Sequence, residues 1–207
     1  PLIELYRKAS AIKGIKKITI GSGIRYDLFI NRPIQEDKSF KHFEYFETLV
    51  KNHVSGRLKV APENTEEKVL KFMRKPNILL YEALNKQFIK INSKHNLNYQ
   101  LIPYLISNYP GNCFDDTVNT ALWLKNHNIK PEQIQDFTPT PMTNSTTAYY
   151  CGFDPYTNET INVLKDVTER KKNQTLFFYY KKENKSAITS ILRKNNRADA
   201  IKKLFNY

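Results

Sequence analysis

The sequence predicts an α/β fold built on a parallel sheet, with a small basic, mostly helical extension at its carboxyl end. Short apolar runs that are typical of buried strands begin at intervals of 34 to 43 residues, and each interval holds apolar residues at helical spacing. A crossover between parallel strands requires an interval of this kind. The extension is predicted by charge, because residues 165–207 contain twelve Lys or Arg and only four Asp or Glu.

The first part of the chain is expected to hold two strands, each preceded by a helix. Apolar residues at helical spacing predict a helix over residues 2–12, and the alternating run at 17–21 predicts the first strand. A stripe of Phe, Leu and Val over 40–50 predicts the next helix, and the second strand is expected at 57–61.

The same alternation continues along the chain. Helical spacing returns over 69–73 and 81–91, ahead of a third strand within 99–106. A helix over 114–125 carries two acids in its first turn, where they favour the helix dipole. The fourth strand is expected at 134–137.

Charge and composition limit the domains and the partners of the chain. A polar stretch at 154–162 separates a main domain, residues 1–152, from the basic extension, residues 165–207, which is expected to be helical at its end. The chain carries a formal net charge of +13, and +8 of it lies in the extension, so anionic partners are favoured. No apolar run is long enough to cross a bilayer, so no membrane partner is expected and the predicted location is the cytoplasm.

Cysteine and histidine usage excludes several kinds of metal and redox site. The two cysteines, Cys113 and Cys151, cannot form a disulfide framework or supply the thiolates of a four-cysteine site. The four histidines share no ligand spacing. No metal-ligating residue is therefore expected in this chain.

Each expected strand is followed by a turn-rich polar segment. These segments are residues 21–23 (GSG), 62–65 (PENT), 107–111 (SNYPG) and 138–142 (TPTPM). Parallel α/β folds bind ligands at the carboxyl ends of their strands, where such turns let the backbone approach a ligand closely. The alternative is that these residues only form the turns, since Gly, Pro and Asn are common in βα loops.

Several strings in the sequence resemble one protein family. Residues 20–28 (IGSGIRYDL), 55–65 (SGRLKVAPENT), 101–111 (LIPYLISNYPG) and 135–146 (QDFTPTPMTNST) are similar, in order and spacing, to the YgiQ-type branch of the radical SAM proteins. The resemblance covers roughly residues 15–155 and depends most on the unusual string DFTPTPM. The basic extension resembles, less distinctively, the region that follows the barrel in that family.

The resemblance implies a partial six-unit TIM-like (βα) barrel, of which this chain would supply about the last four units. It also implies a 4Fe-4S cluster that cleaves S-adenosylmethionine (SAM) to a 5'-deoxyadenosyl radical. The family holds that cluster with a CxxxCxxC motif, and no such spacing exists here. The expected partner is therefore a missing amino-terminal half of the same protein, and this chain alone is expected to be inactive and to hold no catalytic residue.

The resemblance also implies which residues of this chain contact SAM. They are expected to approach its nucleoside and amino acid parts from the turns after the strands: Ser22, Gly23, Arg25, Glu63, Asn64, Ser107, Pro110, Gly111, Thr138 and Pro139. Simpler roles remain open for some of them, since Arg25 can pair with Asp27 on the surface and Glu63 can favour the start of the next helix. Asn112 stands where a Glu is common in the wider superfamily, so no contact is predicted for its side chain.

A second function class is compatible with the sequence. The chain can be a non-enzymatic nucleic-acid-binding module that uses its basic extension together with an aromatic run, residues 177–180, as a charged and stacking surface. The same run can equally be the core of the extension, because its neighbouring lysines do not interleave with the aromatic residues. The substrate of an enzyme is not indicated beyond an anionic preference, for which RNA is one candidate.

Overall fold

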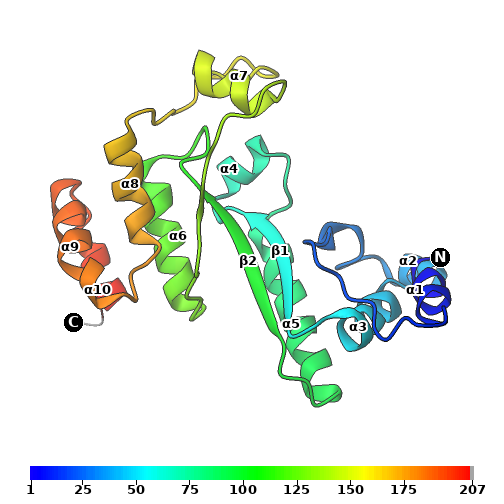
Figure 1. The fold of residues 1–207 in the computed structure, drawn as a ribbon. Helices are drawn as coiled ribbons and strands as arrows, with labels where there is room; N and C mark the ends of the chain where they lie inside the picture. Colours follow the sequence, from blue (N-terminus) through cyan, green and yellow to red (C-terminus); the bar gives the residue numbers. More distant parts are fainter. Residues whose placement is uncertain (206–207) are drawn as a thin grey trace. The chain divides into compact units, whose positions relative to one another are not determined.

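The computed structural model describes residues 1–205 and shows a mixed α/β chain with a small parallel sheet (Figure 1). The sheet has the strand order β1-β2-β3, with β1 at Arg57–Glu63, β2 at Gln100–Ser107 and β3 at Gln135–Asp136. In the parallel pair β2–β3, Ile106 faces Gln135 and Ser107 faces Asp136. The predicted α/β class is confirmed, and the partial barrel stays a prediction.

The chain divides into two compact units. Unit 1 comprises residues 1–61 and 78–103, and unit 2 comprises residues 62–77 and the chain from 104 onward. The predicted division into residues 1–152 and 165–207 follows charge and composition rather than packing, and it also stays a prediction.

Unit 1 is organised around a pair of packed helices. Its helices are α1 (Leu2–Ser10), η1 (Tyr26–Leu28), α2 (Ile34–Phe40), α3 (His42–His53) and α5 (Ile78–Lys94). Phe46 of α3 and Phe88 of α5 are buried, and the spacing of apolar residues on both helices follows the helical repeat that predicted them. Glu47 of α3 accepts from Lys94 at 2.6 Å and lies 2.9 Å from His95, so polar contacts also join α3 to the end of α5.

The predicted strand at 17–21 is wrong. The Ile20 N–H donates to the His53 carbonyl at 2.8 Å, and His53 Nδ1 lies 3.0 Å from the Ile18 carbonyl. These backbone groups are therefore occupied by the end of α3 and cannot form a ladder with β1. Three residues beyond the segment, Ile24 forms one parallel bridge with Val60 of β1.

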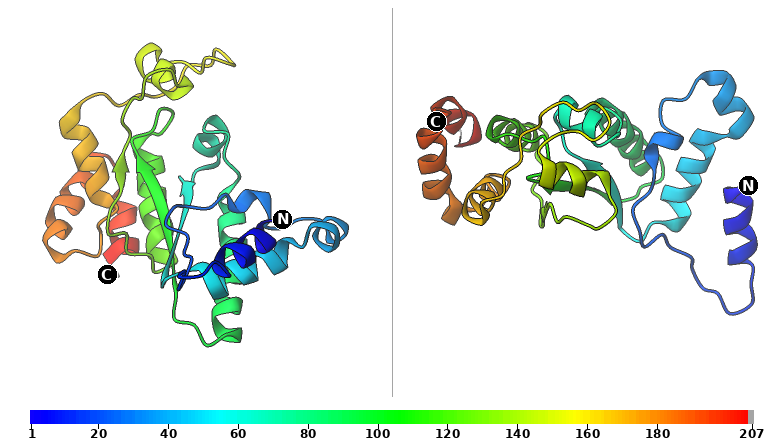
Figure 2. Two further views of the ribbon diagram at one scale, coloured as in Figure 1. Left: turned by 45° about the vertical axis from the view of Figure 1, so that its right-hand side comes forward. Right: turned by 90° about the horizontal axis from the view of Figure 1, so that it is seen from above.

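Unit 2 packs most of its helices around one apolar core. Its helices are α4 (Glu67–Phe72), α6 (Phe114–Asn126), α7 (Asn144–Cys151), α8 (Val167–Leu176), η2 (Lys182–Asn184), α9 (Lys185–Lys194) and α10 (Ala198–Phe205). Val118 and Leu124 of α6, Leu176 of α8 and Leu192 of α9 are fully buried in this core. Figures 1 and 2 show α9 as the outermost of the group α6, α8, α9 and α10 in each view.

The aromatic run at 177–180 belongs to this core. Phe177 is 3% exposed and Tyr179 is 5% exposed, while Phe178 and Tyr180 are half-buried and pack against the same cluster. The Tyr179 hydroxyl donates to the Ile129 carbonyl at 3.1 Å, and that of Tyr180 donates to the Pro131 carbonyl at 2.7 Å. The run is therefore not a stacking surface for bases, and the other expectation, a structural role, is confirmed.

Three helices end on an asparagine in the left-handed conformation. Asn96, Asn128 and Asn196 have φ values of 50°, 52° and 56° at the ends of α5, α6 and α9. In each case the following residue donates its N–H to a carbonyl five positions earlier, at 2.8 to 2.9 Å, which is the Schellman pattern. Asparagine tolerates this conformation better than other residues with a side chain, so it replaces the usual glycine.

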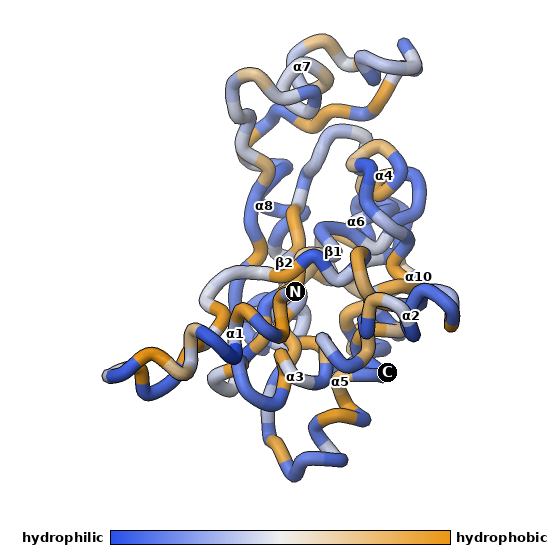
Figure 3. The backbone as a smooth tube through the Cα atoms, turned by 90° about the vertical axis from the view of Figure 1, so that its right-hand side faces the viewer, coloured by the Kyte–Doolittle hydropathy of each residue, from blue (hydrophilic) through white to orange (hydrophobic). Residues whose placement is uncertain are grey.

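Apolar residues alternate with polar ones along the chain (Figure 3). Across residues 1–205, no helix combines the length and the apolar character that a membrane span needs.

Candidate functional site

The carboxyl end of β1 places a carboxylate in an unusual environment. Glu63 has a φ of 70°, a left-handed conformation that residues with a side chain rarely adopt. One of its oxygens, Oε1, lies 3.2 Å from Lys75 Nζ. The other, Oε2, is buried and has no hydrogen-bond partner within residues 1–205.

The environment of Glu63 changes its acidity. Burial raises the pKa of the Glu63 carboxyl, and the nearby Lys75 ammonium opposes that change without cancelling it. A buried carboxylate oxygen without a partner costs free energy unless something donates a hydrogen bond to it. This end of β1 therefore holds a buried carboxylate oxygen to which no group of residues 1–205 donates a hydrogen bond.

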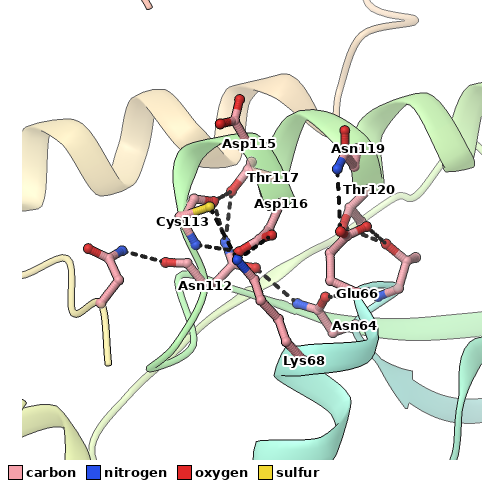
Figure 4. Close-up of polar contacts among 12 residues, drawn as sticks. Asn64, Glu66, Lys68, Asn112, Cys113, Asp115, Asp116, Thr117, Asn119 and Thr120 are labelled. Atoms are coloured by element: carbon pink, nitrogen blue, oxygen red, sulfur yellow. Dashed lines mark hydrogen bonds and ion pairs between the residues drawn. The ribbon is translucent and has the colours of Figure 1, made fainter. Parts of the chain in front are cut away.

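Asn64, the next residue, forms a closed turn. Its Oδ1 accepts from the N–H groups of Thr65 and Glu66, both at 2.9 Å, and its Nδ2 donates to Asn112 Oδ1 at 3.3 Å (Figure 4). Asn64 as a whole is 4% exposed. Asn64 thus shapes the turn after β1, and its amide is already engaged.

A polar network connects this turn to the start of α6 (Figure 4). Asn112 donates to Thr117 Oγ1 at 2.9 Å, and the Thr65 and Thr120 hydroxyls lie 2.7 Å apart. Asp116 accepts from the Cys113 N–H at 2.6 Å. The network fixes the turn after β1 on the first turns of α6 and leaves Asn112, for which no ligand contact was predicted, in a structural role.

A row of aromatic rings lies at the same end of the strands in unit 2. Tyr109 follows β2 and has its ring centroid 5.8 Å from that of Phe72 and 5.1 Å from that of Phe137, which follows β3. The ring centroids of Phe137 and Tyr149, which belongs to α7, lie 5.5 Å apart. Burial raises the pKa of Tyr109, and the charge of Glu63 adds to that effect, so the row and the carboxylate share one neighbourhood.

One cation approaches this aromatic row, since Arg170 lies 5.8 Å from the ring centroid of Tyr149. The Arg74 guanidinium lies 3.8 Å from the ring centroid of Tyr156, which is outside the row. Arg170 is 7% exposed and binds Asp136 of β3 through two nitrogens, at 2.8 and 3.0 Å. Asn108 donates to the same carboxylate at 2.7 Å, so the ends of β2 and β3 are held to α8 by partly buried polar contacts.

Seven of the ten predicted SAM contacts lie in unit 2, and not all have free polar groups. Ser107 is buried, and its hydroxyl interacts with Asp136 Oδ1 at 3.1 Å and with the Gln135 carbonyl at 3.3 Å, which ties β2 to β3. Thr138 is exposed and donates to the Asp136 carbonyl at 3.3 Å, and Pro139 beside it is half-buried.

The turn after β2 contains two further predicted contacts. Pro110 is buried, and Gly111 has a φ of 90°, which is the conformation for which glycine is suited. The Gly111 N–H donates to the Asn162 carbonyl at 2.7 Å. This backbone donor is therefore also engaged within the chain.

The other three predicted contacts lie in unit 1. Ser22, Gly23 and Arg25 are exposed in the loop before η1. Arg25 binds Asp27 through two nitrogens, at 2.8 and 2.6 Å, which is the surface pair that the sequence left open. A Cβ on Gly23 would lie 3.6 Å from the Lys59 carbonyl, an ordinary contact, so space alone does not require glycine there.

Three members of the site were not predicted from the sequence. Lys75 and Tyr149 lie outside the polar turns that follow the predicted strands, and Tyr109 lies within the turn at 107–111 but was not among the predicted contacts. Aromatic residues directly after two neighbouring strands were the available signal for the row. Lys75 gave no such signal, because its approach to Glu63 depends on the path of the chain after α4.

The described residues do not form a metal site. Cys113 and Cys151 are free thiols, and residues 1–205 contain no group of three or more His, Cys, Asp or Glu side chains arranged to hold a metal ion. The donor set in this part of the chain therefore does not fit a 4Fe-4S cluster. For the nucleoside of SAM, the buried Glu63 oxygen and the aromatic row do offer matching groups.

Known proteins match this chain over nearly its whole length. A UPF0313 protein of Bacteroides thetaiotaomicron is 45% identical over 205 residues, which cover 99% of this chain and 33% of that protein. A UPF0313 protein of Porphyromonas gingivalis is 43% identical, and the UPF0313 protein YgiQ of Escherichia coli is 40% identical over 93% of this chain and 25% of its own length. The chain thus spans about a quarter to a third of the relatives it matches.

A family model also matches the second part of the chain. The model described as a domain of unknown function (DUF3362) covers residues 132–203, from before β3 into α10. The relatives confirm the resemblance to YgiQ proteins that the strings at 55–65 and 135–146 indicated. Over nearly its whole length the chain is therefore homologous to one part of the UPF0313 proteins, which include YgiQ.

Proposed function

We propose that this chain is the carboxyl-terminal part of a radical SAM enzyme and supplies the side of a (βα) barrel that binds the nucleoside of SAM. Homology to one part of the UPF0313 proteins and the resemblance of its strings to YgiQ-type radical SAM proteins support the proposal. The bound cluster and SAM would supply a carbon-centred radical. The cluster ligands would come from sequence outside this chain, because its two cysteines cannot supply them.

The unpartnered oxygen of Glu63 is the observation that supports nucleoside binding most directly. Ribose presents two neighbouring hydroxyl groups, and a carboxylate accepts hydrogen bonds from both. Bound ribose would supply the donor that Oε2 lacks and would offset the free-energy cost of burying the carboxylate. Lys75, 3.2 Å from Oε1, would hold the carboxylate in place.

The aromatic row supports adenine binding at the same end of the strands. An adenine ring packs on aromatic side chains through the same offset and edge-on contacts that these rings make with one another. Tyr109 and Phe137 follow β2 and β3, two of the strands whose turns the family resemblance assigns to SAM. Pro139, half-buried beside Phe137, would extend that apolar surface.

Binding of S-adenosylhomocysteine to the full-length protein tests the proposal. Calorimetry of the Glu63→Gln variant is expected to show affinity about 10- to 100-fold weaker than that of the unaltered protein, since a charge-assisted hydrogen bond contributes about 1.5 to 3 kcal/mol. Glu67→Gln is the matched control, because Glu67 is exposed in the first turn of α4. Equal affinity in the unaltered protein and in Glu63→Gln would contradict the assigned role of Glu63.

A further inference from the structure

Helix α9 is amphipathic, with one side buried and the other polar. Ile188 and Leu192 are fully buried in the core of unit 2. The helix lies on the outer side of α8 and α10 in the views of Figures 1 and 2. Its polar side is therefore available at the surface of the unit.

An open groove of about 760 Å³ runs along this polar side, from η2 to the end of α9. Four of the side chains that line it are cations: Lys182, Lys185, Arg193 and Lys194. No carboxylate lines the groove among the residues that the structure describes, and Glu183, the neighbour of Lys182, is not among its lining residues. Four positive charges so close together repel one another, and an anion in the groove would relieve that repulsion.

The cations of the groove are engaged to different degrees. Lys185 lies 5.6 Å from the ring centroid of Phe205, which orients its side chain. For Lys182, Arg193 and Lys194 no ion pair is formed with any other residue of the part of the chain that is described. By contrast, Arg197 nearby binds Asp115 and Asp199 at 2.5 and 3.1 Å, so the chain does neutralise cations just outside the groove.

Hydroxyl groups interleave with the cations. Ser186, Thr189 and Ser190 line the groove on successive turns of α9. Side-chain hydroxyls, together with Lys and Arg, are the usual donors to phosphate oxygens in complexes with nucleic acids. The groove therefore offers both the charge and the hydrogen-bond donors that a phosphate backbone requires.

The length of the groove fits a run of phosphates. From Lys185 to Lys194 the helix rises about 14 Å, since each residue contributes about 1.5 Å. One strand of a duplex carries a phosphate about every 3.4 Å along its axis, so this length corresponds to about four phosphates. A single small anion would use only part of such a site.

The lack of exposed apolar side chains distinguishes a nucleic acid from a membrane surface. Helices that bind in the plane of a membrane bury large apolar residues among the lipids. On α9, Ile188 and Leu192 face the core and Ile191 is half-buried. The basic side of the helix has no large apolar residue to insert.

We propose that the groove along α9 binds the phosphate backbone of a nucleic acid through its lysines, Arg193 and hydroxyl groups. The proposal depends on α9 and η2 alone and is independent of SAM binding. The aromatic residues of the extension take no part in it, because they are needed in the core.

Fluorescence anisotropy tests this proposal on the whole chain, with a labelled 12-base-pair DNA duplex and an RNA duplex of the same length over a series of KCl concentrations. The variant R193Q/K194Q removes two cations of the groove, and K86Q/K90Q removes two exposed lysines one turn apart on α5 in unit 1. For DNA, the plot of log K against log salt is expected to become shallower by about 1.8 in R193Q/K194Q, since each phosphate contact contributes about 0.9. The slope is expected to remain unchanged in K86Q/K90Q.

Three results would overturn the proposal. One is an equal loss of slope in both variants, which would indicate diffuse attraction by net charge. Another is absence of binding to both duplexes at 50 mM KCl. The third is sedimentation of the chain with phosphatidylserine vesicles, reduced by R193Q/K194Q, without binding to either duplex. Circular dichroism of each variant establishes that the helices are retained, and K182Q/K194Q provides a second variant if R193Q/K194Q does not fold.

Discussion

Glu63 shows how one residue can cost stability and still be suited to a function. Its backbone is left-handed, its Oε2 is buried without a partner within residues 1–205, and burial raises the pKa of its carboxyl. The left-handed backbone costs free energy in either protonation state, and burial of the carboxyl costs free energy when the group is ionised. A residue in such a position is a candidate for ligand binding on physical grounds.

The pH dependence of stability tests this view of Glu63. Because the folded pKa is raised, the contribution of Glu63 is fully present below its unfolded value of about 4.3 and is lost as the pH rises. Glu63→Gln is therefore expected to unfold at a higher urea concentration than the unaltered chain at pH 7, and at about the same concentration near pH 4. Urea titrations at several pH values measure the difference in unfolding midpoint between the variant and the unaltered chain, with Glu67→Gln as the exposed control. A difference in midpoint that stays constant with pH would mean that ionisation of Glu63 is not its cause.

At the scale of elements, the sequence predicted best where periodicity alone decides the structure. The stripes of α5 and α6 were identified correctly because their buried residues recur at helical spacing. The stripe over 40–50 located α3 in part, but it included Phe40, which ends α2 and is exposed. The strand expected at 17–21 does not form, because the Ile20 N–H donates a hydrogen bond to the His53 carbonyl. This contact joins residues distant in sequence, so local periodicity could not reveal it. Helix α2 was not predicted, since the segment Ile34–Phe40 has no buried residue and no apolar stripe.

The candidate site was predicted in part for the same reason. The turns after β1, β2 and β3 were located to within two residues, because the strands before them are marked by apolar runs; Pro62 and Glu63, expected in a turn, still belong to β1. The sequence could not show that Ser107 is hydrogen-bonded to Asp136 and Asn64 to Asn112. Nor could it show that Glu63 Oε2 has no hydrogen-bond partner within residues 1–205. Those facts depend on which side chains the fold brings together.

Helix α8 provides a test at the scale of one element. Asp166 caps this helix by accepting from the Glu169 N–H at 2.8 Å, and the helix carries Arg170 to Asp136. Asp166→Ala is expected to lower the free energy of unfolding by about 1 kcal/mol, the usual cost of a lost cap. Asp166→Asn should retain most of the stability, because asparagine caps as well. Chemical denaturation compares the three proteins, and equal losses in both variants would show that charge, rather than the cap, is what matters.

At the scale of the whole molecule, the relatives are three to four times as long as this chain, which matches 25% to 33% of them. A complete radical SAM site needs cysteines that this chain lacks. The proposed function therefore requires that the natural polypeptide include further sequence that carries the cluster.

The size and iron content of the natural protein check this expectation. An antibody raised against this chain should detect in the source cells a band several times larger than 24.3 kDa. The larger protein, purified without oxygen, should contain iron and sulfide, whereas the chain of 207 residues should contain neither. A band at 24.3 kDa would contradict the enzyme proposal and leave a binding role.

The asparagines that end α5, α6 and α9 have a consequence for how the sequence can drift. A change to glycine at Asn96, Asn128 or Asn196 would remove the small cost of a side chain in the left-handed conformation. It would also widen the range of conformations of the unfolded chain, which acts in the opposite direction. Because the two effects oppose each other, exchange between asparagine and glycine at these positions is nearly neutral. A relative can therefore carry either residue at these three positions and still end the helices at the same places.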